Sequence, residues 1–405
     1  MIRARTVTAL RAVGVAGLTC ATLIEPARSQ DAPDLTVGLA AGLTHDTNPD
    51  LTPQGSAPAT RGTLDLSFGL TVETPASALV LRGSVGLLDS EGAALSDPQV
   101  TLTYDRISAD ADFHIDGMVQ QSDAASINDI TNFTTGTGQR RVASLQSALN
   151  LGTSRPLGFG LTAGVSDISY HNTPSPDLAG SRTLNLGSSL RADLSPVLHA
   201  NLGISASRFT QDAMADRDTI GYSAGLTLDR PTGPLALELL VEDTPDGTRS
   251  RLGFDHQIAL ATGGQLAYGL GMTRGVSQKN YVDGSVAYTQ DLPAGTISVD
   301  LSRDVTDGAE TNTETVQSRA SLGATHSVTS MADLTLSLDW AEQRDTASGL
   351  SDANTSVTAT WTQSLTEDWA LDVGYAHQIH DQNLAGRGQS DQVSLALRRS
   401  FALRF

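Results

Sequence analysis

The sequence predicts an all-β fold, a transmembrane antiparallel up-and-down β-barrel of about 20 strands, within a range of roughly 18 to 22. Three observations lead to this prediction. Apolar and polar residues alternate along most of the chain, the connections between the alternating segments differ in length in a regular order, and an export signal stands at the start. Each is taken in turn below.

The N-terminal segment has the pattern of a secretory signal. Arg3, Arg5 and Arg11 precede the apolar run 12–24, and Ala27-Arg28-Ser29 has small residues at the offsets of a cleavage site. We therefore expect a signal peptide over residues 1–29, cleaved near Ser29, and a barrel over residues 30–405. The first strand follows so closely that we expect no plug or periplasmic helical-repeat domain, which argues against a TonB-dependent transporter or an assembly factor.

Cysteine usage fits export. The only cysteine, Cys20, lies inside the apolar run and would leave with the signal. We expect neither disulfides nor a thiol-bound metal in the mature chain. A lipoprotein is a lesser alternative, because Thr19 stands where a small Gly, Ala or Ser is expected.

Segment after segment alternates apolar with small polar residues, the pattern of a strand with two different faces. Residues 64–72, 220–228 and 334–340 show it clearly, with Leu, Val, Ile and aromatic side chains on one face and Gly, Ser, Thr and Asp on the other. The polar face lacks the Lys and Glu that cover a soluble sandwich, and Lys279 is the only lysine. A hydrated lumen with an apolar face turned to lipid fits this composition better.

The alternating segments number about twenty, an even number, as in outer-membrane barrels. We place strands at 34–44, 61–74, 77–88, 98–106, 110–121, 139–153, 157–170, 183–194, 197–209, 218–229, 233–242, 249–261, 264–274, 279–289, 295–304, 315–328, 331–341, 354–364, 368–378 and 390–405.

The connections carry the second signal. Long ones at 46–60, 89–96, 122–137 and 171–181 alternate with tight ones such as 75–76, 154–156 and 195–196, and later 231–232, 263, 291–294 and 367. Outer-membrane barrels combine short periplasmic turns with longer external loops. With both chain ends on the periplasmic side, the first strand has to lead into a long loop, as it does here.

The last strand ends on alternating apolar residues, with Phe401, Leu403 and Phe405 on one face. This resembles the terminal signal of outer-membrane barrels, which implies recognition by the barrel-assembly machinery. Arg399 interrupts the apolar face, so we expect it either where the strand leaves the lipid band or at a bulge that turns it inward. Aromatic residues are few, and we expect a sparse girdle on the apolar faces.

Residues 35–51, one alternating strand followed by a loop with Asp46, Thr47 and Asn48, resemble the opening of a family of porin-like outer-membrane barrels of Gram-negative bacteria. The family has an adjacent Asp-Asn pair, which Thr47 separates here. The resemblance implies an outer-membrane protein, a pore or a barrel associated with exopolysaccharide, and it implies no catalytic residue.

Charge and composition exclude several classes. The chain carries 45 acidic against 26 basic side chains, a net charge of −19, so we expect no nucleic-acid partner. No apolar run of roughly 18 residues follows the signal, which excludes a helical inner-membrane protein. We find no Ser-His-Asp grouping, and we predict neither an enzyme nor a bound cofactor.

Two small groups are weighed as metal ligands. Asp46, Asn48 and Asp50 have calcium-loop spacing, but Leu51 stands where such a loop needs Gly, so a polar surface loop is the preferred interpretation and metal binding stays open. His377 and His380 fall on opposite faces of a strand, and we expect both to be solvated at its end. No metal site is predicted.

Parity along the strands assigns mostly acidic residues to the lumen, and rings of carboxylates favour cations. We predict a passive channel for small hydrophilic solutes in the outer membrane, in contact with its lipids, and one interpretation of the acidic lumen is that the channel favours cations. The competing interpretations are carboxylates that only hydrate the lumen, and a structural barrel for adhesion or exopolysaccharide export. The solute, a possible constriction loop and a monomeric or trimeric state stay open. The predicted lumen residues are Asp65, Arg82, Asp105, Asp112, Asp116, Arg191, Asp255, Asp283, Asp300, Arg319, Asp339 and Asp372.

Overall fold

The computed structural model describes residues 33–89, 93–124, 138–173, 178–212, 214–307, 313–383 and 386–404. The predicted signal peptide, Cys20, most of the 122–137 loop and Phe405 lie outside these residues. Among the described residues, no helix is long and apolar enough to cross a membrane.

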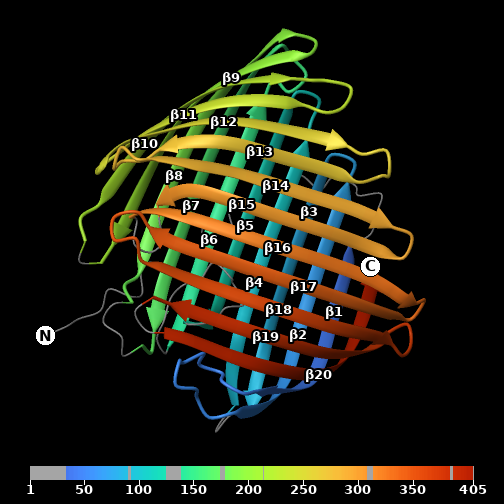
Figure 1. Ribbon diagram of the computed structural model, residues 1–405. Coiled ribbons are helices and arrows are strands. Elements are labelled where there is room, and N and C mark those ends of the chain that lie inside the picture. Colours follow the sequence, from blue (N-terminus) through green and yellow to red (C-terminus); the bar gives the residue numbers. More distant parts are fainter. Residues whose placement is uncertain are drawn as a thin grey trace, which may run out of the picture.

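The described chain folds into one closed sheet of 20 strands (Figure 1). Each strand pairs antiparallel with its sequence neighbours, and β1 pairs with β20 to close the barrel. The predicted fold class is therefore confirmed. The strands are β1 (Asp34–Asp46), β2 (Ala59–Thr74), β3 (Ser77–Asp89), β4 (Ala93–Ile107), β5 (Ala111–Asp123), β6 (Gln139–Leu151), β7 (Leu157–His171), β8 (Ser181–Ser195), β9 (Leu198–Gln211), β10 (Arg217–Leu228), β11 (Leu235–Thr244), β12 (Gly247–Ala259), β13 (Gln265–Arg274), β14 (Asn280–Leu292), β15 (Gly295–Asp307), β16 (Glu314–Thr329), β17 (Ala332–Asp345), β18 (Ser351–Ser364), β19 (Trp369–Gln382) and β20 (Gly386–Arg404).

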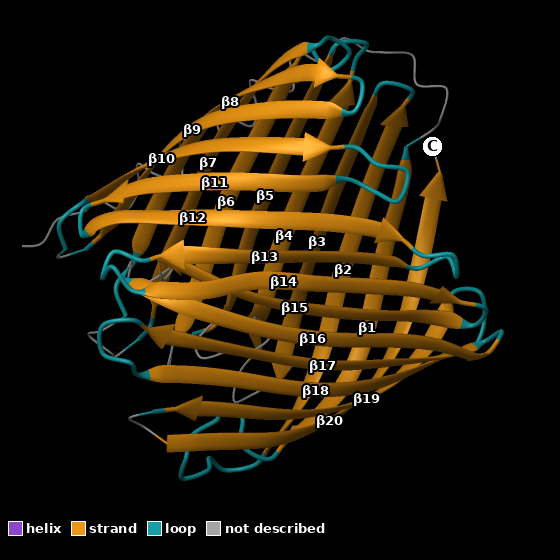
Figure 2. Ribbon diagram, turned by 45° about the horizontal axis from the view of Figure 1, so that its top comes forward, coloured by secondary structure: helices purple, strands orange, loops and turns teal. Residues whose placement is uncertain are grey.

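The barrel has two different ends. We call the end where even strands turn into odd ones, and where Arg404 pairs with Asp34, the turn end; the opposite end is the loop end. Figures 1 and 2 show the strands of the front wall crossing those of the rear wall obliquely, as expected when strands tilt around a barrel axis.

The predicted alternation of loop lengths holds in the first half of the chain and fades in the second. Residues 47–58 and 172–180 separate strands at the loop end, against 75–76 and 196–197 at the turn end. Later, however, only 245–246 separate two strands at the loop end, while 229–234 separate two at the turn end.

The long loop predicted at 89–96 is wrong, because β3 extends to Asp89 and β4 begins at Ala93. The register shifts between Ser84 and Gly86, and Asp97 has a positive φ of 44° at that irregularity. A bulge accommodates Pro98, which has no N–H to donate, and the pairing resumes beyond it. Pro98 therefore lies inside β4, at the bulge, and does not end the strand.

The outer face of the wall is apolar and exposed. Leu39 is 43% exposed and its neighbour Leu66 48%, and the same alternate positions carry apolar side chains around the barrel. The inner face carries glycine, hydroxyl and charged residues. Glycine has a steric reason there: a Cβ at Gly38 would lie 2.3 Å from the Oγ of Ser67 on the neighbouring strand.

Most aromatic residues on the outer face lie towards the turn end. The register and strand bounds place there Tyr104, Phe113, Phe159, Phe254, Tyr268, Tyr288, Trp361, Trp369 and Phe401. Phe68, Tyr222 and Tyr375 lie nearer the middle of their strands and Trp340 lies towards the loop end, so the sparse girdle is denser at the turn end. Interfacial aromatic belts combine an apolar ring with a polar edge, so this end has the character of a membrane interface.

Arg399 stays on the outer face near the turn end, and no bulge turns it inward. It pairs in register with Leu39 and Trp369. Its guanidinium carbon lies 5.2 Å from the Trp369 ring and 4.5 Å from the Phe401 ring. Two aromatic faces stabilise the cation at a position where an isolated charge would be costly.

Candidate functional site: the inner face of the barrel

The cross-strand register places every predicted lumen residue on the inner face of the wall. Each stands opposite inner-face residues of its neighbours, as Asp65 does opposite Ala40 and Gly86. The remaining residues of the set are Arg82, Asp105, Asp112, Asp116, Arg191, Asp255, Asp283, Asp300, Arg319, Asp339 and Asp372.

A charged cluster spans β11 to β16 on this face. The Nε of Arg251 on β12 lies 2.8 Å from Oδ1 of Asp283 on β14, and Thr273 of the intervening strand donates to Oδ2 of Asp283 at 2.6 Å. The side chain of Asp283 is only 1% exposed. Gly271 makes the contact possible, since a Cβ there would lie 2.1 Å from Asp283 Oδ1. The ion pair between Arg251 and Asp283 is therefore packed against the backbone of the barrel wall.

A histidine clamped between two carboxylates lies on β5. The Nδ1 of His114 lies 2.6 Å from Oδ1 of Asp105, and its Nε2 contacts Asp116. Thr103 donates to Asp116 at 2.9 Å. Carboxylates only accept hydrogen bonds, so both ring nitrogens must donate, which defines the imidazolium cation.

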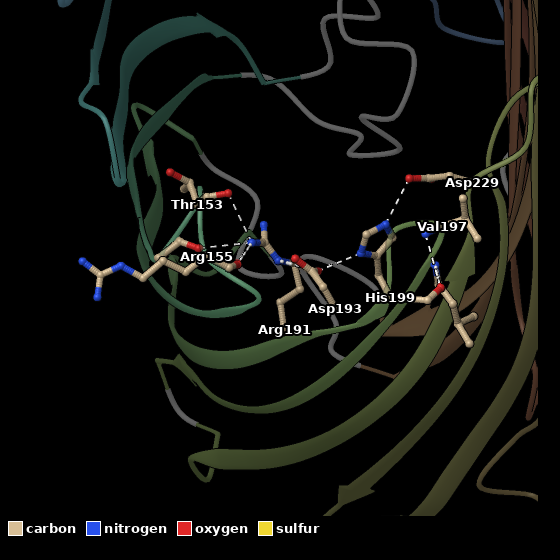
Figure 3. A network of polar contacts seen from close by, with 10 residues as sticks. Thr153, Arg155, Arg191, Asp193, Val197, His199 and Asp229 are labelled. Atoms are coloured by element: carbon tan, nitrogen blue, oxygen red, sulfur yellow. Dashed lines mark hydrogen bonds and ion pairs between the residues drawn. The ribbon is translucent and has the colours of Figure 1, made fainter.

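A second clamp lies at the turn end, where His199 reaches Asp193 with Nδ1 at 2.7 Å and Asp229 with Nε2 at 3.0 Å (Figure 3). Arg191 lies 3.3 Å from the same Asp193 and donates to the carbonyl of Arg155 at 2.9 Å. The network connects the turn 152–156 with the start of β9 and the end of β10. Ion pairs and hydrogen bonds therefore fix the polar side chains at the turn end of the barrel.

Other predicted lumen residues make local contacts. Asp372 accepts from Arg398 on β20 and from Thr362 on β18, the latter at 2.7 Å. Asp339 accepts from Ser321 at 2.6 Å. The set is therefore spread around the barrel instead of gathered at one point, and the structure brings together only neighbours on adjacent or alternate strands.

The loop 47–58 folds against the inner face of β20. Asn48 is only 5% exposed, and its Nδ2 donates to the carbonyls of Thr52 at 3.0 Å and Gln389 at 2.9 Å, while its Oδ1 accepts from the backbone N–H and the hydroxyl of Ser56. Asp46 accepts from the N–H of Asn48 at 2.9 Å. Asp46 and Asn48, two of the three residues with calcium-loop spacing, thus anchor the loop.

His380 corrects another expectation. It lies on the inner face and is 7% exposed, with Nδ1 bonded to Asn354, instead of being solvated. Its Nε2 is buried without a hydrogen-bond partner among the described residues. His377 lies on the opposite face, as expected, and bonds to Asp391 at 2.9 Å. The alternation along the strand does not indicate this burial.

Sequence reasoning missed the cations that balance part of the acidic wall. Arg251 and His114 share the parity of predicted acidic residues on their own strands, Asp255 on β12 and Asp116 on β5, so parity alone could have found these two. Their pairing could not be predicted, because it depends on which strands are neighbours and in which register. Within the described ranges, no three His, Cys, Asp or Glu side chains are arranged to hold a metal ion.

Fold and inner face together define the class: a closed antiparallel barrel of the outer-membrane type. No family model matches the chain, and no curated protein does. Among solved structures, a mutant of the ferric enterobactin receptor of Pseudomonas aeruginosa is similar, with a TM-score of 0.51 and 10% identity over 92% of this chain and 81% of that chain. The copper transporter OprC has a TM-score of 0.50 and 12% identity, over 93% and 81%. At such identities the likeness is one of fold.

Proposed function

We propose that the chain is an outer-membrane channel through which small hydrophilic solutes diffuse passively, with a preference for cations. The observation that carries this proposal is the contrast between an exposed apolar outer face and a charged inner face that is mainly acidic. Fold likeness to a receptor and a copper transporter supports a transport role and indicates no cargo.

The inner-face charges are unevenly balanced on the described strands. Acidic positions are Asp34, Asp46, Asp65, Glu73, Asp105, Asp112, Asp116, Asp193, Glu238, Glu242, Asp255, Asp283, Asp291, Asp300, Asp304, Asp333, Asp339, Asp345, Asp352 and Asp372, and cationic arginine positions are Arg61, Arg82, Arg140, Arg191, Arg217, Arg249, Arg251, Arg319 and Arg398. Among the described residues, no cation pairs with Asp300 or Asp339. Uncompensated carboxylates facing a lumen attract cations.

Localisation and assembly form the second part of the proposal. The signal peptide 1–29 would direct export, and the mature barrel 30–405 would insert with its turn end on the periplasmic side. The alternating end of β20, with Phe401 and Leu403 before Phe405, would be read by the barrel-assembly machinery.

Reconstitution tests the channel directly. In liposome swelling with sugars of increasing size, we expect fast entry of the smallest sugars and a size cut-off. No swelling with the smallest sugar would refute a general diffusion channel and favour the alternative, a structural or export-associated barrel. Loop 47–58, folded against the inner face, is the observation that favours this alternative.

Selectivity needs a separate measurement. In a salt gradient of about tenfold, the reversal potential should show cation preference, and the double variant Asp300→Asn/Asp339→Asn should weaken it by about twofold. Asp243→Asn is the matched control, because Asp243 lies on the outer face, where it accepts from Thr248 at 2.9 Å. Anion preference in the unmodified protein would refute the cation claim.

A further inference from the structure

The outer face carries its cations unevenly. On the described strands, fewer outer-face arginines lie towards the turn end than towards the loop end. The apolar band lies between the two groups. The register assigns Arg106 and Arg399 to the turn end, and Arg141, Arg182, Arg208, Arg274, Arg303, Arg344 and Arg387 to the loop end.

Most loop-end arginines face a carboxylate on the same outer surface. Arg208 donates to both oxygens of Asp218 at 2.6 and 2.8 Å. Arg344 donates to Glu342 at 2.8 Å. Arg182 stands in register with Asp167, and Arg387 with Asp381. These guanidinium groups are already matched in charge.

Arg141, Arg274 and Arg303 differ, because their register neighbours on both sides are neutral. Arg141, opposite Gln121 and Ser169, is half-buried, whereas Arg274 and Arg303 are exposed. Arg274 at the end of β13 stands opposite Ser250 and Asn280. Arg303 on β15 stands opposite Gly284 and Ser318. Both are exposed, and no ion pair joins either to a carboxylate in the described part of the chain. One strand, β14, separates them.

Exposed apolar side chains lie beside these arginines. Leu270 is 63% exposed, Met272 55% and Val282 66%, and the cross-strand pair Met272 and Val282 lies between the register levels of Arg274 and Arg303. Gly284 leaves a step in the outer surface between Leu270 and Arg303; a Cβ there would lie 2.6 Å from the carbonyl oxygen of Gly269 and 3.4 Å from the Leu270 side chain. Apolar surface with a step of this kind suits an acyl chain, and a guanidinium at its edge suits a phosphate.

We propose that Arg274, Arg303 and the apolar step at Gly284 form a binding site for a phosphate-bearing lipid of the surrounding leaflet. The phosphate oxygens accept from the two guanidinium groups, while an acyl chain lies over Leu270, Met272 and Val282. This inference rests on the proposed membrane location and not on channel activity. It requires no bond to be made or broken.

Native mass spectrometry of the whole barrel in a neutral detergent tests the site, with phosphatidic acid and phosphatidylcholine as probes. We expect one phosphatidic acid to be retained about tenfold more than phosphatidylcholine, because its phosphomonoester offers three free oxygens and more negative charge to two guanidinium groups, whereas the phosphodiester of phosphatidylcholine lies beside a choline cation. The double variant Arg274→Gln/Arg303→Gln should lose this preference. The control Arg208→Gln/Arg344→Gln, in which the paired arginines are changed, should keep it.

Three results would overturn the proposal. Equal retention of both lipids would remove the phosphate preference, and unchanged retention by the Arg274 and Arg303 variant would place binding elsewhere. Displacement of phosphatidic acid by an equal concentration of inorganic phosphate would show that the groups bind free phosphate instead of a lipid. Heat-modifiable gel mobility checks that each variant is folded. Conductance of the same preparations is measured separately, so that absence of channel activity can be distinguished from absence of lipid binding.

Discussion

Replacing Asn48 with alanine should destabilise the seam where β1 and β20 close the barrel. Asn48 belongs to the loop 47–58, and through its side chain this loop contacts the other end of the chain, at Gln389 on β20. Its backbone N–H also reaches the hydroxyl of Ser390 at 3.1 Å. The side chain therefore links residues that are far apart in sequence.

The magnitude follows from the bonds that are lost. The amide of Asn48 donates two hydrogen bonds to carbonyls and accepts two from Ser56, at 2.7 to 3.0 Å, and the residue is 5% exposed. Each intramolecular hydrogen bond contributes about 1 kcal/mol, and more where the remaining partner is left buried. Because the loop lies at a mouth that water can enter, we expect a loss of about 2–4 kcal/mol.

The free energy of unfolding can be measured by urea titration in lipid vesicles, followed by the fluorescence of the three tryptophans. Asn48→Asp sharpens the test, since it keeps the acceptor oxygen but removes both donor bonds and adds a charge beside Asp46. It should be at least as destabilising as Asn48→Ala.

Asn185→Ala is the matched control, because Asn185 is an exposed inner-face asparagine on β8. Its unfolding free energy should stay within about 0.5 kcal/mol of the unmodified protein. If Asn48→Ala were equally mild, the loop would not stabilise the seam and the reasoning would be refuted.

Further predictions concern the two faces. Asp283→Ala should cost about 3 kcal/mol in urea titrations by leaving Arg251 unpaired, and Asp283→Ala with Arg251→Met should recover most of it; no recovery would contradict a paired charge. Arg399→Glu should lower the free energy of unfolding by about 2 kcal/mol, because two cation–π contacts become repulsive, and the folded fraction on heat-modifiable gels should fall accordingly. Arg399→Lys should be milder. His114→Gln/His199→Gln should increase the cation preference measured as a reversal potential, because it removes two basic side chains from an acidic inner face; an unchanged reversal potential would contradict this.

Local alternation was sufficient to predict the strands. Side chains alternate across a strand whatever its neighbours are, so the period of two in segments such as 64–72 revealed both faces and the even strand number. The same parity placed residues such as Asp300 and Asp339 on the inner face. The predicted loop 89–96 was wrong, since the bulge at Asp97 and Pro98 depends on the pairing of β3 with β4.

The sequence by itself determined an all-β chain with an apolar face, a polar face and an acidic excess, because these properties belong to single strands and to composition. Only the tertiary structure decided which charges meet. Register brings Arg251 to Asp283 and places carboxylates on both sides of His199, while barrel closure brings Asn48 to β20. These contacts join residues that are distant in sequence, and the energy of each depends on distances and burial that only the assembled wall defines.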